Sequence, residues 1–129
     1  MHPNTHLGID SALVGAPVSL GEGRATARLV TTPAMAADAR GLVHGGFVFG
    51  LADYAAMLVV NDPNVVLGAA ETRFLAPVAV GEVVEAEAER AEVKGRKHVV
   101  KVSARVGDRV VFDGTFTTFV LDRHVLDRG

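Results

Sequence analysis

The chain has 129 residues, of which 49% are hydrophobic and 22% are charged. These values are typical of a folded domain with one hydrophobic core, so we expect residues 1–129 to form a single domain. Its net charge of −2 gives no electrostatic reason to expect a nucleic acid or an anionic membrane as a partner. The absence of cysteine excludes disulfides, zinc–thiolate sites and thiol nucleophiles.

The N-terminal part of the chain is weakly patterned. Its first ten residues, MHPNTHLGID, lack the charged start and apolar run of a signal peptide, and we therefore expect a cytoplasmic protein. Several glycines interrupt residues 1–22, where we expect at most a short helix near residues 10–14. Residues 24–30 then alternate between apolar and polar side chains, which predicts a half-buried strand.

The longest apolar segment runs from about His44 to Val60 and predicts a helix, which Pro63 prevents from continuing much further. The segment contains a histidine, an aspartate and three glycines, and it lies between polar segments. These features are typical of a buried core helix rather than a membrane span. Because the helix is apolar nearly all round, it needs cover on every side.

The chain after this helix reads as four strands joined by short turns. The strands are predicted at about 65–75, 84–93, 100–106 and 109–121, with a change of apolar phase that predicts a β-bulge near 89–90. On the last strand we expect one face to carry Val110, Phe112, Phe116 and Val120. The order of elements predicts an α+β fold in which an antiparallel sheet packs on one long helix, its open side closed by a second subunit.

Asp53 is the only charged residue in the predicted helix. Its neighbours three and four positions away are apolar or glycine, so no cation on the same helix pairs with it. An unpaired carboxylate is rarely buried, because burying its charge alone is costly. The position predicts a functional carboxylate that faces a polar cleft or meets a group from elsewhere in the fold.

The start of the helix offers the complementary chemistry. The first turn of a helix leaves amide N–H groups unpaired, and the helix dipole makes that end electropositive. Gly45 and Gly46 carry no side chains that would shield these amides, so a ligand oxygen can approach closely. Such amides suit a carbonyl oxygen that gains negative charge during acyl transfer. On its own, the glycine pair is better explained by a tight turn into the helix.

Gly45 and Asp53 are too far apart on one helix to act on the same substrate atom. Eight residues at about 1.5 Å each separate them by roughly 12 Å along the axis, whereas a base or nucleophile acts at about 3 Å. A second copy with its helix antiparallel would place each Asp53 near the other chain's Gly45. The spacing therefore predicts a two-fold dimer with two equivalent sites.

With His44-Gly-Gly46 opening the helix and Asp53 eight residues after the first glycine, the chain resembles the hotdog-fold acyl-CoA thioesterases, in particular the phenylacetate-degradation and 4-hydroxybenzoyl-CoA group. The segment Thr72-Arg-Phe-Leu-Ala-Pro77, followed by Gly81-Glu82, also resembles the strand and turn after that family's helix. The resemblance covers about residues 24–121.

The resemblance implies a hotdog fold, a homodimer that is often doubled into a homotetramer, and hydrolysis of an acyl-CoA, with coenzyme A thioester as substrate and no cofactor. By the same resemblance the Gly45 N–H polarises the thioester carbonyl, and Asp53 of the partner chain acts as nucleophile or as general base on water. His44 would position the loop and the thioester. Two departures concern auxiliary hydrogen bonds: Asp38 stands where many relatives have asparagine, and Gly68 where some have a serine that holds the water or the carboxylate.

Lys94, Arg96 and Lys97 form a second candidate site at a predicted hairpin. Similar proteins use the corresponding turn to hold the phosphates of coenzyme A, although a solvated charged turn explains the residues equally well. The remaining histidines have no metal-ligand spacing, and we expect no metal site; they are His2, His6, His98 and His124.

Two other functions remain open. Segments 94–96 and 106–112 also resemble the acyl-CoA-binding domain of fatty-acid-synthesis repressors, which bind malonyl-CoA-type effectors without hydrolysis but lack the helix aspartate. An enoyl-thioester hydratase or dehydratase on the same fold would require a histidine paired with an acid, whereas His44 lies at the helix start. The acyl group and the choice between dimer and tetramer are not determined by the sequence.

Overall fold

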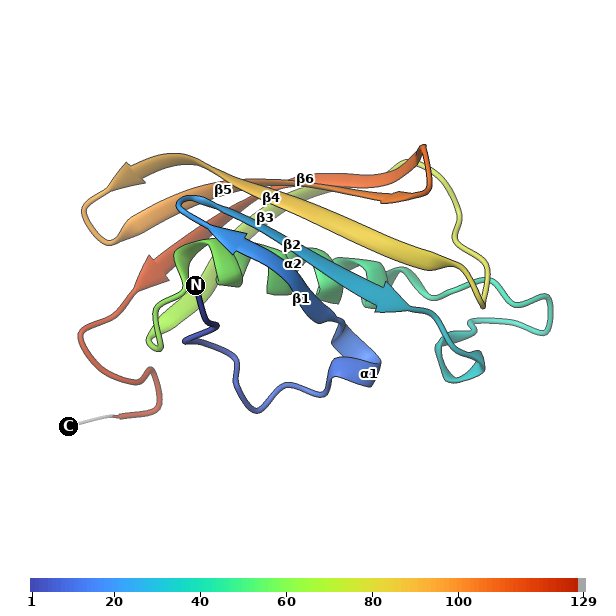
Figure 1. The fold of residues 1–129 in the computed structure, drawn as a ribbon, viewed down its shortest axis with the longest axis horizontal. Coiled ribbons are helices and arrows are strands. Elements are labelled where there is room, and N and C mark those ends of the chain that lie inside the picture. The colour runs from blue at the N-terminus through green and yellow to red at the C-terminus, as the bar shows by residue number, and fades with distance from the viewer. Residues whose placement is uncertain (128–129) are drawn as a thin grey trace.

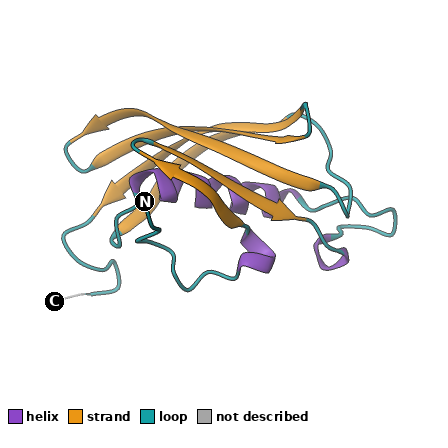
Figure 2. Ribbon diagram, viewed as in Figure 1, coloured by secondary structure: helices purple, strands orange, loops and turns teal. Residues whose placement is uncertain are grey.

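The computed structural model of the chain describes residues 1–127, in which one six-stranded antiparallel sheet curves around one long helix (Figures 1 and 2). The strand order across the sheet is β1-β2-β4-β5-β6-β3. In chain order the elements are α1 (Ser11–Val14), β1 (Ala16–Gly21), β2 (Arg24–Val30), a 3-10 turn (Pro33–Met35), α2 (Gly45–Val60), β3 (Val65–Phe74), β4 (Val83–Lys94), β5 (Lys97–Val106) and β6 (Arg109–Val120). The predicted α+β hotdog architecture is confirmed.

Helix α2 has the bounds that its apolar run predicts. His44 precedes it in an extended conformation (φ −62°, ψ 131°), and Asn61 ends it in the left-handed conformation (φ 53°). Asparagine tolerates this conformation better than most residues, because its short polar side chain can hydrogen-bond locally. The helix therefore stops two residues before Pro63, through a C-cap of its own.

Two sequence expectations for the strands were wrong. Strand β1 was missed because it is short, lies at the edge of the sheet and is almost entirely exposed, so its side chains do not alternate. On β6, Val110 is 44% exposed whereas Val111 is 1% exposed. A register shift between β5 and β6 at Ala104/Arg105 turns the chain over between these two valines. The bulge predicted at 89–90 is present one residue later, between Arg90 and Glu92.

The core lies between the concave face of the sheet and α2. Small and large apolar residues alternate on this face, and the alanines let the helix approach the sheet closely. The fully buried side chains of the sheet include Ala27, Leu29, Val84, Ala86, Val100, Ala104, Phe112 and Phe116. The convex face carries cross-strand ion pairs such as Arg28–Glu85 at 3.0 Å and Arg105–Glu87 at 2.7 Å. These exposed pairs contribute little stability, so burial around α2 holds the fold together.

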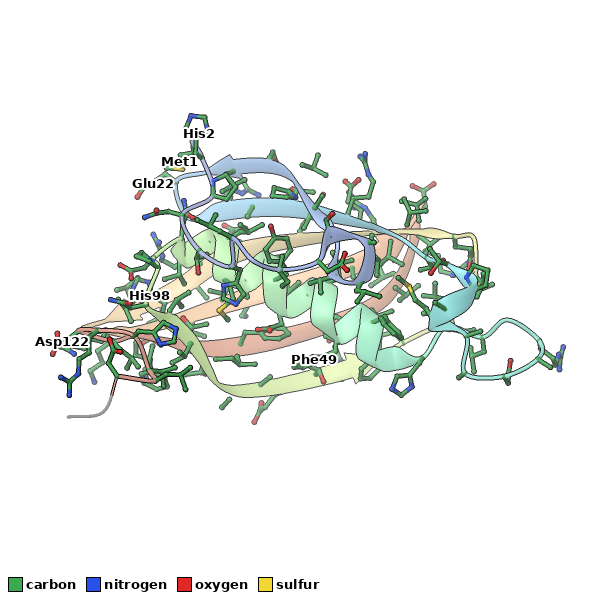
Figure 3. The ribbon with its side chains drawn as sticks, turned by 90° about the horizontal axis from the view of Figure 1, so that it is seen from below. Met1, His2, Glu22, Phe49, His98 and Asp122 are labelled. Atoms are coloured by element: carbon green, nitrogen blue, oxygen red, sulfur yellow. The ribbon has the colours of Figure 1, made fainter. Side chains whose placement is uncertain are left out.

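The sheet leaves part of α2 uncovered. The N-terminal segment covers one flank: the Asn61 side chain accepts from the Asn4 amide and donates to the His2 carbonyl, and the His6 ring lies 6.3 Å from that of Tyr54. Figure 3 shows the helix from the side away from the sheet. The positions that stay exposed or half-exposed along one stripe of α2 are Gly46, Phe49, Gly50 and Asp53. We call these four residues the open stripe.

The two edges of the sheet differ. Edge strand β1 is interrupted by a register shift after Pro17, which blunts it against further pairing. Edge strand β3 also has a register shift, after Leu67, but it is ten residues long, and among the described residues it pairs on one side only, with β6. Such a long free edge is suited to pairing with another strand. None of the helices among residues 1–127 combines the length and the apolar character needed to cross a bilayer.

Gly15 fixes the junction between α1 and β1 against α2, and its replacement by alanine tests this packing. Gly15 has φ +109°, and an added Cβ would lie 2.8 Å from both the Arg28 carbonyl oxygen and Leu51 Cδ1. We expect Gly15→Ala to lower the free energy of unfolding by about 2–4 kcal/mol through backbone strain and overpacking. Gly8→Ala, where an added Cβ meets nothing within 4 Å, is the control. Equal urea midpoints for the two variants would contradict the packing role.

Candidate active site

The first turn of α2 presents unpaired amides. The Phe47 N–H donates to the His44 carbonyl at 3.1 Å, while the amides of Gly45 and Gly46 have no acceptor within the described residues. The His44 N–H donates to the Met35 carbonyl at 2.9 Å, which fixes the approach of the chain to the helix. The predicted pair of free N–H groups is therefore present at an electropositive helix end.

Two aromatic rings lie beside these glycines. The Phe74 ring lies 3.1 Å from the point where a Cβ of Gly45 would be, and the His44 ring lies 3.0 Å from the corresponding point at Gly46. The two rings occupy the space that side chains would otherwise take, which explains the glycine pair sterically as well as chemically. His44 is exposed and makes no side-chain capping bond. Its ring also stands edge-on to Phe47, with centroids 6.2 Å apart.

Asp53 is half-buried on the open stripe. Its Oδ1 atom is buried and has no hydrogen-bond partner among residues 1–127. Desolvation raises the pKa of its carboxyl from 3.8 to about 6. An unsatisfied buried carboxylate destabilises the fold that carries it, so its position indicates a role outside the folding of one protomer.

The structure does not bring Asp53 to the glycine amides within one protomer. Both lie on the same helix, separated by roughly 12 Å along its axis. Asp53 shares the open stripe with Gly46, Phe49 and Gly50. An added Cβ at Gly50 would meet nothing within 4 Å, so the middle of the stripe is a shallow gap in the surface of the protomer.

An apolar cavity of about 410 Å³ lies beside Gly45. It is formed by the start of α2, the segment after β3 and one residue of β6. The residues whose side chains shape it include Val43, Val48, Phe74, Leu75, Val78 and Val111. These residues come from three separate parts of the sequence. The sequence alone did not reveal this cavity, because no local pattern joins these segments.

The three predicted phosphate-binding cations lie at the other end of the molecule. They flank the β4–β5 hairpin, which Figure 1 shows near the C-terminal end of α2. The Arg96 side chain pairs with Asp122, and Lys94 and Lys97 are register partners. Gly45 lies at the opposite end of α2. Within one protomer, roughly the length of this helix, about 24 Å, therefore separates Gly45 from the hairpin. Lys94, Arg96 and Lys97 are thus not part of a site formed by one chain alone.

The two departures from the resemblance have structural explanations. The Asp38 Oδ1 atom accepts from the amides of Arg40 and Leu42, at 2.9 and 3.2 Å, and thereby holds the loop that leads to His44. Gly68 has no room for a side chain, because an added Cβ would lie 2.4 Å from the Phe119 ring. A serine hydroxyl at this position would require that ring to move.

Comparisons with known proteins show which families and folds the chain is similar to. The family described as fluoroacetyl-CoA-specific thioesterase matches residues 57–124, more than half of the chain. Methylthioribose-1-phosphate isomerase of Aquifex aeolicus is 50% identical over 95% of this chain and 27% of its own length. Transcription factor FapR of a Thermoanaerobacter species is 31% identical over 67% of this chain and 44% of its own length. The chain thus spans less than half the length of these curated relatives.

Solved structures share the whole fold. A protein from Pyrococcus horikoshii superimposes with a TM-score of 0.97 at 49% identity, over 98% of both chains. A variant of the phenylacetic acid degradation protein PaaI from Thermus thermophilus superimposes with a TM-score of 0.79 at 28% identity, over 86% of this chain and 96% of that one. With its sheet wrapped around one helix and its match to a thioesterase family, this chain belongs to the hotdog-fold thioesterase family.

Proposed function

We propose that the protein is an acyl-CoA thioesterase whose site is shared by two protomers. The observation that carries the proposal is the half-buried, unpartnered carboxylate of Asp53 on the same open stripe as the free amides of α2. A hydrolase needs both an acceptor for the carbonyl's developing charge and a group that activates water. The chain supplies both, at a distance that one copy cannot bridge.

In this mechanism the Gly45 and Gly46 amides donate to the thioester carbonyl oxygen. The partner's Asp53 accepts a proton from water, and the water oxygen forms a bond to the carbonyl carbon. The tetrahedral intermediate collapses by breaking the carbon–sulfur bond, and coenzyme A leaves as a thiol after taking that proton. Direct attack by the carboxylate, followed by hydrolysis of the anhydride, is the other route open to the same residue. His44 would keep the first turn of the helix accessible by holding its ring beside Gly46.

The open stripe supports the shared site through its symmetry. Its midpoint falls between Phe49 and Gly50. Antiparallel packing about this midpoint brings Phe49 against the partner's Gly50, and Asp53 against the partner's Gly46. A two-fold contact of this kind is self-complementary, and the free edge of β3 offers a second surface for it. The partner's Lys94 and Lys97 would then lie beyond the helix start, where they suit the phosphates of coenzyme A.

Effector binding without hydrolysis is the second candidate, because FapR is a related transcription factor. A pure binding site has no use for an uncompensated carboxylate, whereas hydrolysis requires one. A hydratase is less compatible with the site, since His44 pairs with no acid among residues 1–127. The isomerase name belongs to a relative of which this chain spans only 27%, so we do not extend it to this domain.

The substitution Asp53→Asn should change the rate of thiol release and the free energy of unfolding in opposite directions. We expect thiol release from acyl-CoA to fall by about a hundredfold or more, because the base or nucleophile is lost. The free energy of unfolding should rise by about 1–3 kcal/mol at pH 8, since a pKa raised from 3.8 to about 6 disfavours the ionised carboxylate in the folded state. This gain should disappear as pH falls below about 4, where the carboxyl is protonated in both states. An Asn variant less stable than wild type at pH 8 would contradict the buried-charge account.

Mixing two inactive variants tests whether the site is shared. Gly45→Pro removes the amide donor; proline is tolerated at the first helical position, and His44 already has the extended conformation that precedes it. We expect Asp53→Asn and Gly45→Pro protein, unfolded and refolded together, to recover about a quarter of wild-type activity. Half of the dimers are then mixed and each has one intact site. Mixed dimers detected by native mass spectrometry without activity would place the site in one chain.

Gly50→Gln tests the helix contact itself. In the protomer an added Cβ at Gly50 meets nothing within 4 Å, but in the proposed dimer this side chain would separate the two helices. We expect a shift to monomer in light scattering and at least a tenfold loss of thiol release, with an unchanged circular dichroism spectrum. Gly21→Gln is the matched control, because an added Cβ there also meets nothing within 4 Å. A fully active Gly50→Gln dimer would rule out this packing.

A further inference from the structure

The cavity beside Gly45 has a consistent chemical character. Its volume of about 410 Å³ lies near the lower end of the range for small-molecule sites, roughly 300–1,000 Å³. Every residue that lines it is apolar or glycine, and none carries a charge or a side-chain hydrogen-bond donor or acceptor. A carboxylate placed there would lose its hydration without gaining a partner, which is strongly unfavourable.

Phe74 lines this cavity next to the helix start. The ring is 56% exposed, and its edge lies 3.1 to 3.7 Å from the Cβ point of Gly45. On its other side it stands edge-on to the fully buried Phe112, with ring centroids 5.2 Å apart and planes at 75°. Phe74 is therefore anchored by the core on one side and borders both the cavity and the free amide on the other.

We infer that this cavity binds the acyl group of the thioester, that the acyl group is uncharged, apolar and of medium length, and that Phe74 determines this specificity. The inference rests on the proposed thioesterase function. A carbonyl oxygen bound by the Gly45 amide places the carbon on its acyl side next to the cavity. The sulfur then points outward, toward the surface where a long polar coenzyme can extend.

The lining predicts how affinity depends on the acyl group. Each methylene that enters an apolar cavity strengthens binding about three- to fourfold, or roughly a hundredfold over the four methylenes that distinguish hexanoyl from acetyl. The gain ends when the cavity is full, so palmitoyl-CoA should bind no better than hexanoyl-CoA. Succinyl-CoA, which has the length of butyryl-CoA but carries a carboxylate, should bind about a hundredfold more weakly than butyryl-CoA.

Two substitutions should change this profile in opposite directions. Phe74→Ala removes one side of the cavity, so we expect the optimum to move to longer chains, with palmitoyl-CoA binding about tenfold more tightly than hexanoyl-CoA. Ala76→Leu, from the segment that lines the cavity, fills part of it. This variant should lose at least tenfold in hexanoyl binding and less than threefold in acetyl binding. General structural damage would not produce opposite shifts. Phe119→Ala, a partly exposed ring of β6 outside this lining, is the matched control and should keep the wild-type profile.

The test measures dissociation constants for acetyl-, butyryl-, hexanoyl-, palmitoyl-, benzoyl- and succinyl-CoA by calorimetry, with each substitution placed in the full-length Asp53→Asn protein. This background binds without turnover, so the acyl preference is read even if the wild type proves not to hydrolyse thioesters. Thiol release by wild-type protein is measured separately and decides the proposed function. The inference is supported by the expected chain-length profile, by an affinity for benzoyl-CoA near that for hexanoyl-CoA, and by the two opposite shifts. A flat profile, tight succinyl binding, a profile unaffected by Phe74→Ala, or no binding at all overturns it.

Discussion

An uncompensated charge in the middle of an apolar helix is the constraint on which the rest of the structure depends. Nine of the sixteen residues of α2 are buried, and the sheet supplies the apolar surface that covers them. Asp53 is left half-buried with a desolvated carboxylate and a raised pKa. The fold can hold this residue only because the sheet and the N-terminal segment leave one stripe of the helix open. The open stripe thus leaves the Asp53 carboxylate half-exposed, and a ligand or a second protomer can reach it there.

The length of α2 keeps two chemical groups apart, the amides of its first turn and the Asp53 carboxylate. Its N-terminal end offers amides that favour developing negative charge, while Asp53 lies two turns further along. A rigid helix cannot shorten this distance, so cooperation between the two groups requires a second helix. Small residues in the stripe allow close approach, and the free edge of β3 gives the second copy a place to continue the sheet. On this view, assembly and catalysis follow from the same geometric limit.

The neighbourhood of Gly45 links this chemistry to selectivity. Glycine suits this position because the Phe74 ring lies 3.1 Å from the point where a side chain would begin, and the same ring borders the apolar cavity. One contact thus keeps an amide accessible and limits what can lie next to it. The relatives of this chain carry names that range from a thioesterase to a transcription factor. Since fold alone does not fix function, we propose that local features such as Asp53 and Phe74 decide between these activities.

The sequence by itself determined what depends on local periodicity and on chemical contrast. The apolar run of α2, the alternation of β2 and the short turn between the strands predicted at 100–106 and 109–121 were predicted correctly, because each is set by residues close together in the chain. Asp53 could be recognised because a single charge among apolar residues has no local partner. The amides of Gly45 and Gly46 followed from the helix start.

Only the tertiary structure decided what depends on contacts between distant segments. The bulge that exposes Val110 and buries Val111 is a property of strand pairing, and β1 owes its place to the edge of the sheet. The cavity joins segments about thirty residues apart, and the contact of Phe74 with Gly45 arises where they meet. The separation of Lys94 and Lys97 from the helix start could not be read from spacing, because it reflects how the sheet is ordered around α2. Local patterns fix the elements, whereas packing fixes which of their surfaces remain free to act.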